Sequence, residues 1–316
     1  MNRRVLVTGG AGFIGSHVAD AFLAAGWEVA VLDDFSRGRE ANLPRDVEIH
    51  RLDIRSAAAR ELTARGGFEV ICHHAAQIDV RVSVSDPVLD AQLNIVGLLN
   101  LLMGAREGGV RRVLLASSGG TVYGAGQPPF RESDPKLPVS PYGVAKLSSE
   151  YYLAAFGAMY GLEYVSLRYT NVYGPRQDPH GEAGVVAIFC NRLRNGSAIT
   201  IFGDGSQTRD YVYVEDVARA NVLAAEAKLP GSDGSLDACA FNIGTGTETS
   251  VVELARALMR ATGRQVAEEY APPRTGELQA NSVINEKARR VLGWRPEVDL
   301  ITGLGRTAAH IFAEGD

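Results

Sequence analysis

Residues 4–16 read Arg-Val-Leu-Val-Thr-Gly-Gly-Ala-Gly-Phe-Ile-Gly-Ser. The apolar run 4–8 is typical of a short buried strand, and residues 16–25 place their apolar side chains at helical spacing. The glycines between them allow a tight turn and a close approach of the backbone to a pyrophosphate, while the helix N-terminus offers amide donors. The stretch therefore predicts a strand, a phosphate-binding turn and a helix.

The next expected strand, residues 27–33, ends in an acid about 20 residues after the glycines. A carboxylate at Asp33 can accept hydrogen bonds from ribose hydroxyls and would repel a 2′-phosphate, which favours NAD over NADP. Arg37 lies near enough in sequence to weaken that preference. A glycine-rich hairpin turn is the alternative, but it does not explain the order of strand, helix, strand and terminal acid.

The first half of the chain continues this alternation. Strands are expected near residues 3–8, 27–33, 47–53, 69–75 and 111–118, with helices between them. Such a pattern predicts an α/β fold with a doubly wound, Rossmann-like parallel sheet that binds its ligand beyond the carboxyl ends of the strands.

Beyond residue 170 the pattern loosens into segments punctuated by Pro and Gly, with helical spacing near 185–195, 215–228, 250–262 and 300–313. We expect a dinucleotide-binding domain over residues 1–170 and a smaller α/β substrate-binding lobe over residues 171–316. Parts of residues 210–245 could return to pack on the first domain.

Composition narrows the class of protein. The 316 residues are 46% apolar with a net charge of -5, which gives no basic surface for nucleic acid. No apolar run approaches the about 20 residues that cross a bilayer, and the chain enters its first strand without a signal-peptide pattern. We expect a cytoplasmic protein without a membrane partner.

Metal binding is not expected. Cys72, Cys190 and Cys239 are scattered, so buried reduced thiols are the simplest interpretation. His73 and His74 are adjacent at the end of an expected strand, where neighbouring side chains point to opposite faces. A zinc site there is improbable.

Tyr142 and Lys146 are four residues apart in an expected helix and would lie on the same face. A tyrosine has a pKa of about 10, and a neighbouring ammonium favours the phenolate, so the two can act together in proton transfer. The spacing alone also arises by chance on exposed helices, and it gains weight from the nucleotide-binding pattern before it.

Further motifs follow in order along the chain. They are Thr8–Gly15, Asp33, Asp53, His74-Ala-Ala-Gln-Ile-Asp-Val80, Asn94, Ser117-Ser118, Val122-Tyr-Gly124, Tyr142 with Lys146, Asn171-Val-Tyr-Gly-Pro175, Arg209-Asp-Tyr211 and Arg274-x-Gly-Glu277. With these motifs the whole chain resembles the extended short-chain dehydrogenase/reductase family, and within it the nucleotide-sugar epimerases.

The resemblance implies NAD as cofactor, with Lys146 on the nicotinamide ribose, and a UDP-sugar as substrate. The implied NAD contacts are Gly9, Gly12, Phe13, Ile14, Gly15, Asp33, Asp34, Ser36, Arg37, Gly38, Asp53, Ile54, His74, Ala75, Ala76, Gln77, Asn94, Ser117, Tyr142 and Lys146. The implied substrate contacts are Asn171, Val185, Thr200, Phe202, Arg209, Arg274, Glu277 and Asn281.

Some of these residues also suit their roles chemically. The guanidinium groups of Arg209 and Arg274 match the geometry of a diphosphate, although surface ion pairs are an alternative. Asn171 could instead cap a turn. Asn281 occupies a position where some of these epimerases place a bulky tyrosine against the sugar 2-substituent, so a pocket wide enough for a 2-acetamido group is expected unless Asn281 only caps a turn.

One position departs from the epimerase pattern. Gly119 stands where these enzymes usually carry a serine or threonine that contacts the reacting hydroxyl. Thr121 and Ser118 are the available hydroxyls, and we rank Thr121 first. The related dehydratases and decarboxylases carry an acid just before Val-Tyr-Gly, where this chain has Gly120-Thr121, so epimerisation is favoured over both.

The resemblance implies inversion at C4 of a UDP-hexose through a transient 4-keto sugar, with Tyr142 moving the proton. The alternatives are a dehydrogenase or reductase of the same family with net turnover of NAD(H), and a catalytically idle NAD-binding module. A test with both UDP-hexoses and no added NAD separates these functions.

Residues 90–107 and 142–160 are long helical patterns with apolar side chains on more than one side. The apolar side chains are Leu98, Leu99, Leu101, Leu102, Leu147, Leu153, Phe156 and Met159. The family resemblance implies a homodimer that pairs two such helices from each subunit. Burial against the second lobe is the competing explanation.

Overall fold

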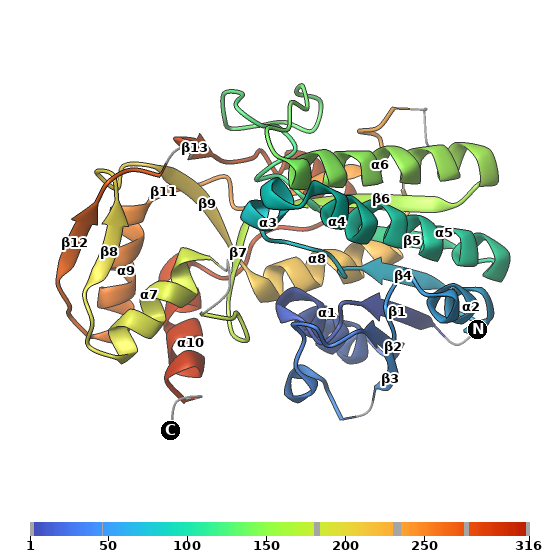
Figure 1. The fold of residues 1–316 in the computed structure, drawn as a ribbon, viewed down its shortest axis with the longest axis horizontal. Helices are drawn as coiled ribbons and strands as arrows, with labels where there is room; N and C mark the ends of the chain where they lie inside the picture. Colours follow the sequence, from blue (N-terminus) through green and yellow to red (C-terminus); the bar gives the residue numbers. More distant parts are fainter. Residues whose placement is uncertain (1–2, 46, 180–183, 230–234, 275–277, 314–316) are drawn as a thin grey trace.

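The computed structural model describes residues 3–45, 47–179, 184–229, 235–274 and 278–313. Among them, seven parallel strands form one sheet in the order β10-β6-β5-β4-β1-β2-β3 (Figure 1). The strands are β1 (Arg4–Thr8), β2 (Glu28–Asp33), β3 (Glu48–Arg51), β4 (Val70–His73), β5 (Arg112–Ser118), β6 (Glu163–Tyr169) and β10 (Ala240–Ile243). The predicted Rossmann-like sheet is confirmed.

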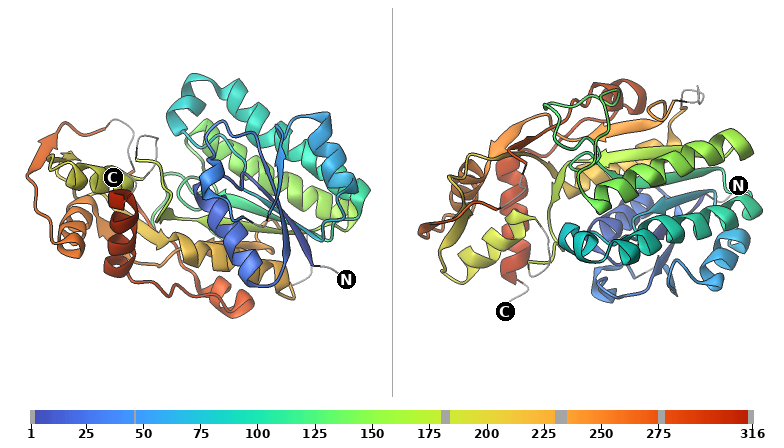
Figure 2. Two further views of the ribbon diagram at one scale, coloured as in Figure 1. Left: turned by 90° about the horizontal axis from the view of Figure 1, so that it is seen from below. Right: turned by 45° about the horizontal axis from the view of Figure 1, so that its top comes forward.

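Alternating side chains of the strands supply two separate cores. In β1, Val5 and Val7 join one core with helices α1 (Phe13–Ala24) and α8 (Val214–Glu226). Leu6 joins the opposite core. Figure 2 shows the sheet with helices on both of its faces.

The second face of the sheet is covered by α2 (Ala57–Arg65), α5 (Gly97–Gly108) and α6 (Pro141–Tyr160). α3 (Val80–Ser85), α4 (Pro87–Ala91) and a π-helical turn, η2 (Gln92–Val96), lead into α5. Leu98, Leu101, Leu102, Leu153 and Phe156 are buried against this sheet and not against the second lobe.

The continuous helix Pro87–Gly108 is the one helix among the described residues that is long and apolar enough to cross a membrane, by length and composition alone. The sequence analysis did not expect such a segment. Buried core helices pass the same test, and 44% of the most apolar window of this helix is buried within the protein. The observation is therefore weak evidence for a membrane span.

The remaining elements form a smaller lobe at one end of the sheet (Figure 1). Its strands are β7 (Asn171–Tyr173), β8 (Ile199–Phe202), β9 (Thr208–Tyr213), β11 (Glu248–Ser250), β12 (Glu268–Ala271) and β13 (Ala280–Asn281). Its helices are α7 (Val185–Arg194), α9 (Val251–Thr262) and α10 (Leu300–Ala313), which enclose a third core. Two short helices lie outside this lobe: η1 (Glu40–Asn42) lies between β2 and β3, and η3 (Ala288–Leu292) packs on α8 and β10 of the large sheet.

The chain passes between the lobes several times. β9 lies in the second lobe and leads directly into α8, which covers the large sheet, while β10 is that sheet's edge strand beside β6. The chain then returns to the second lobe at β11, which pairs with β9. The two lobes are thus tied together by backbone as well as by side chains.

Most expected elements appear where the sequence placed them, with small shifts at their ends. α1 begins at Phe13 and not at Ser16, because Gly12 already caps the helix in an extended conformation. The strand expected over 47–53 is shortened to residues 48–51. Cys72, Cys190 and Cys239 are all buried, as predicted.

Gly104 allows α5 to pack closely on α2, since a Cβ there would overlap the Thr63 hydroxyl oxygen and the Arg60 carbonyl oxygen. Gly104→Ala should therefore lower the free energy of unfolding by about 1–3 kcal/mol, as overpacking does. Gly305→Ala in α10 is the matched control, because the nearest atom to its added Cβ is 4.0 Å away. Urea unfolding should show the control unchanged or slightly stabilised, and equal stabilities for both variants would contradict the packing argument.

Candidate active site

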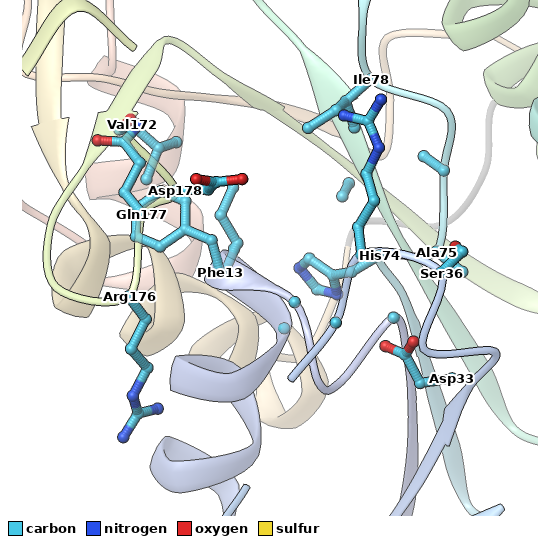
Figure 3. Close-up of a pocket in the computed structure, with 18 of the residues that line it drawn as sticks. Phe13, Asp33, Ser36, His74, Ala75, Ile78, Val172, Arg176, Gln177 and Asp178 are labelled. Atoms are coloured by element: carbon cyan, nitrogen blue, oxygen red, sulfur yellow. Dashed lines mark hydrogen bonds between the residues drawn. The ribbon is translucent and has the colours of Figure 1, made fainter. Parts of the chain in front are cut away.

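A cavity of about 510 Å³ lies beyond the carboxyl ends of the large sheet's strands, where the second lobe meets it. Its wall includes the glycine turn after β1, the ends of β2, β4 and β5, and the start of α6. Figure 3 shows Asp33, Ser36 and Ala75 on one side of this cavity and Val172, Gln177 and Asp178 on another, with Phe13 beside them. Parallel strands bring these distant segments to one rim.

Glycine is required in the turn after β1. Gly9 has φ +66°, and a Cβ on it would lie 2.6 Å from the Ala75 amide nitrogen. A Cβ on Gly15 would overlap the carbonyl oxygen of Gly9. The described residues place no side-chain cap on α1, so its first amides are available to an anion in the cavity. The turn fits the pyrophosphate of a dinucleotide.

Asp33 lies at the rim of the cavity and is buried. Its carboxylate accepts hydrogen bonds from the amides of Ala11, at 3.0 Å, and Phe35, at 2.8 Å. Burial raises the pKa of Asp33, although both hydrogen bonds oppose that shift. A Cβ on Gly38 would approach the Asp33 Oδ1 to 2.9 Å, so the glycine keeps space beside the carboxylate.

α6 carries the tyrosine and the lysine, as expected. Ser140 caps the helix by accepting the Gly143 amide at 3.2 Å. Lys146 Nζ lies 5.7 Å from the centre of the Tyr142 ring and donates to the Ala116 carbonyl at 2.8 Å. Both side chains line the cavity.

Burial dominates the proton affinities of this pair. It lowers the pKa of Lys146 to about 8, with the carboxylates of Asp90 and Glu150 opposing the shift. Burial also raises the pKa of Tyr142, and the charge of Asp90 adds to that effect. The expected lowering of the tyrosine pKa by the ammonium is therefore not seen in the protein alone, because desolvation of the phenolate outweighs it.

Gln77 and Asn94 lie beside the cavity and not in its wall. The Asn94 side chain accepts from the Gln77 amide at 2.9 Å and donates to Asp90 Oδ1 at 3.0 Å. Gln77 Nε2 also donates to Asp90 Oδ1 at 2.9 Å. These bonds fix the segment after β4 against the π-helical turn, so both residues support the wall instead of forming it.

Ser118 and Thr121, the two hydroxyl residues considered from the sequence, lie in different surroundings. Ser118 lines the cavity, whereas Thr121 does not. The Thr121 hydroxyl is buried, and no hydrogen-bond partner for it is found among the described residues. Gly119 continues the pairing of β5 with β6, its amide donating to the Tyr169 carbonyl at 2.8 Å. Of the two, Ser118 is therefore the residue at the cavity wall.

The residues expected to bind the substrate gather in the second lobe. Asn171 lines the cavity. Val185 begins α7, Thr200 and Phe202 lie on β8, and Arg209 lies on β9. These four, with Arg274 and Asn281, lie outside the cavity wall, and Glu277 lies outside the described residues.

Two contacts organise this group. The Arg274 guanidinium lies over the Phe202 ring at 4.1 Å from its centre. Asn281 pairs with Arg209 in the register of β13 and β9 and is buried. Its amide nitrogen lies 3.4 Å from the Gly119 carbonyl oxygen, which places Asn281 against the loop that carries the departure from the epimerase pattern.

Most of the other NAD residues expected from the sequence line the cavity, including Gly12, Ile14, Asp34, Arg37, Asp53, Ile54, His74, Ala76 and Ser117. The sequence analysis missed a segment after β7, namely Arg176, Gln177 and Asp178, together with Tyr169 and Thr170. Arg176 forms an ion pair with Asp20 of α1 at 2.7 Å. The Asn171–Pro175 motif directly before Arg176 was the available signal for this segment.

The arrangement defines a dinucleotide-binding site with Tyr142 and Lys146 in its wall. Residues 5–244 match the NAD dependent epimerase/dehydratase family. The chain belongs to this family.

Similar proteins cover nearly the whole chain. UDP-glucose 4-epimerase of Mycolicibacterium smegmatis is 47% identical, with 96% of this chain and 97% of the relative covered. The crystal structure of UDP-glucose 4-epimerase with UDP-glucose from Thermotoga maritima has a TM-score of 0.92 at 43% identity, covering 99% of this chain and 100% of the other. The Thermus thermophilus UDP-glucose 4-epimerase complex with NAD has a TM-score of 0.89 at 45% identity, covering 98% of each.

Lys146→Met should stabilise nucleotide-free protein near neutral pH. Below about pH 8 the folded and unfolded chains both carry the proton on Lys146, so the cost of burying the charge is fully present. As the pH rises from 8 towards 10.5, the folded protein loses this proton first and the cost disappears. The shift corresponds to about 3 kcal/mol, offset by about 1 kcal/mol for the lost hydrogen bond.

Urea unfolding of the wild type and of Lys146→Met at neutral pH and above pH 10.5 tests this linkage. The advantage of the variant should be present at the lower pH and vanish at the higher one. The same difference at both values would show that the charge on Lys146 does not limit stability.

Proposed function

We propose that this enzyme inverts C4 of a UDP-hexose, interconverting UDP-glucose and UDP-galactose. The observation that carries the proposal is the Tyr142–Lys146 pair, set at the wall of a cavity that also holds the glycine turn of a dinucleotide site. The similar UDP-glucose 4-epimerases, which cover nearly the whole chain, support the same reaction.

Bound NAD would supply the acceptor for a hydride from C4 of the sugar and the donor for its return to the opposite face. Gly9, Gly12 and Gly15 would hold its pyrophosphate, Asp33 its adenosine ribose and Lys146 its nicotinamide ribose. Tyr142 accepts the proton of the C4 hydroxyl and later gives it back. Ser118, which lines the same wall, would bond that hydroxyl.

Lys146 supports this proton transfer by its charge. The buried ammonium lies beside the ring of Tyr142 and stabilises the phenolate as it forms. Burial raises the pKa of Tyr142 in the protein alone, which makes its phenolate, once formed, a stronger base towards the C4 hydroxyl.

The second lobe would hold the nucleotide and leave the sugar ring free to turn. Arg209 and Arg274 are suited to the diphosphate, and Arg274 is held in place by stacking on Phe202. We place the domain boundary near residue 170, with α8 and β10 returning to the large sheet. Positioning by the diphosphate with a loosely held ring permits hydride return to either face.

Purified protein should interconvert UDP-glucose and UDP-galactose without added NAD, and Tyr142→Phe should lower turnover by about 100-fold or more because the proton acceptor is lost. Tyr270→Phe, at an exposed site in the second lobe, is the control and should leave turnover unchanged. Bulk formation of NADH would indicate a dehydrogenase instead. Absence of turnover with NAD bound would indicate an idle NAD-binding module.

The same assay with UDP-N-acetylglucosamine and its galacto epimer tests the width of the sugar pocket. Asn281 is smaller than the tyrosine of some relatives, which favours the acetamido pair as additional substrates. Because Asn281 also contacts the Gly119 carbonyl, activity on the unsubstituted pair alone would leave it as a residue that supports the loop.

We also propose a cytoplasmic homodimer. α4, η2 and α6 lie side by side and expose Val88, Val96, Val144, Tyr151, Tyr152 and Met159, with Val88 64% and Met159 60% exposed. A surface helix of a monomer needs one apolar stripe, and α6 already buries Leu153 and Phe156 in the core. The second apolar face suits a second copy of this chain.

Met159→Glu should shift the protein from dimer to monomer at micromolar concentration, because it places a charge in the proposed interface. Tyr270→Glu is the control, since Tyr270 is 56% exposed but lies in the second lobe. Light scattering that shows a monomeric wild type would exclude the dimer.

A further inference from the structure

Glu150 and Arg168 form an ion pair in which both side chains are 0% exposed. The Arg168 Nε donates to Glu150 Oε1 at 3.0 Å, and Nη2 donates to Glu150 Oε2 at 2.6 Å. The other donors of Arg168 reach Asp237, Tyr123 and the Glu132 carbonyl. A buried guanidinium with partners for all its nitrogens is held in a single orientation.

This pair lies directly behind the cavity. Glu150 follows Lys146 by one helical turn on α6, and Arg168 faces Ser117 in the register of β6 and β5. Ser117 belongs to the cavity wall, and its hydroxyl donates to Glu150. One carboxylate therefore joins the helix that carries Tyr142 to the strand end that carries Ser117.

The pair also holds the loop after β5. Arg168 Nη1 donates to the Tyr123 hydroxyl at 3.1 Å, and that hydroxyl donates to Asn242 Oδ1 at 2.6 Å. Tyr123 is fully buried and stacks on Phe130. The loop that includes Gly119 is thus anchored at both ends, by β5 and by Arg168.

Stability alone does not account for this arrangement. Desolvation of two charges commonly cancels their attraction, and apolar residues of similar volume often serve the fold as well. An ion pair also fixes the relative orientation of the two side chains, because its hydrogen bonds require particular angles that apolar packing does not. Because the ion pair lies behind Tyr142 and Lys146, the orientation that it fixes can determine where these two side chains lie.

We propose that Glu150 and Arg168 are positioning residues for the epimerisation: their buried ion pair sets α6 against the ends of β5 and β6 and so places Lys146 and Tyr142. This inference rests on the proposed function. Neither residue lines the cavity, so each acts through the groups that it holds.

The charges around Lys146 give this role a measurable signature. Asp90 faces it from α4, Glu150 and Tyr142 lie on its own helix, and His73 and His74 lie at the end of β4. Burial lowers the pKa of both histidines to about 3, so they stay neutral. Asp90 and Glu150 are therefore the anions that support the charge on Lys146, and loss of either lowers the pKa of Lys146 further.

The test compares Glu150→Gln with Glu163→Gln. Glu163 pairs with buried Arg112 at the opposite end of the same two strands, away from the cavity, and serves as the matched control. In Glu150→Gln, the alkaline midpoint of the kcat profile should move to lower pH by about one unit, the usual size of a neighbouring charge's effect. Glu150→Asp should restore much of the shift, and Glu163→Gln should show none.

A second variant guards against a folding defect, because Glu150→Gln leaves Arg168 with one anionic partner fewer. Glu150→Gln with Arg168→Gln removes both charges and should shift the alkaline midpoint in the same direction but by less, because the Arg168 cation, which opposes the charge on Lys146, is removed as well. An unchanged midpoint in a folded Glu150 variant, or an equal shift in Glu163→Gln, would overturn the inference. A wild type without epimerase turnover would instead refute the proposed function, so the two failures are distinguishable.

Discussion

No side chain fits where the turn after β1 meets the segment that follows β4. A Cβ on Gly9 would lie 2.6 Å from the Ala75 amide nitrogen, and one on Gly15 would overlap the turn itself. This close approach brings the N-terminus of α1 to the rim of the sheet, where its amides face the cavity. The positions of Asp33 and Lys146 matter chemically only because the turn leaves that space open between them.

The two buried cations near this cavity, Lys146 and Arg168, differ in how many hydrogen-bond partners they have. Lys146 loses solvation and keeps one carbonyl acceptor, whereas Arg168, one layer behind it, has a full set of partners. A group whose pKa must change during a reaction cannot have all its hydrogen bonds satisfied in a single protonation state. On the proposed function, Lys146 belongs to the part of the site that reacts, and Arg168 to the part that holds it in place.

The second lobe depends on the first through the backbone. β9 continues into α8, and β10 returns to the large sheet, so neither lobe is a simple consecutive segment. Asn281 of β13 then reaches the Gly119 loop of β5. Sequence periodicity located these helices and strands, but it gave only a soft boundary near residue 170 because pairing between distant strands leaves no local pattern.

The sequence by itself determined the strand, glycine turn and helix, the acid at Asp33 and the Tyr142–Lys146 spacing, because each follows from local geometry. The resemblance supplied most other residues of the cavity wall. Only the tertiary structure placed Ser118 and not Thr121 in the cavity wall, added Arg176 to Asp178, and paired Glu150 with Arg168. Those outcomes depend on which side chains meet across the fold. Burial reversed the expected shift of the Tyr142 pKa, and burial exists only once the chain has packed.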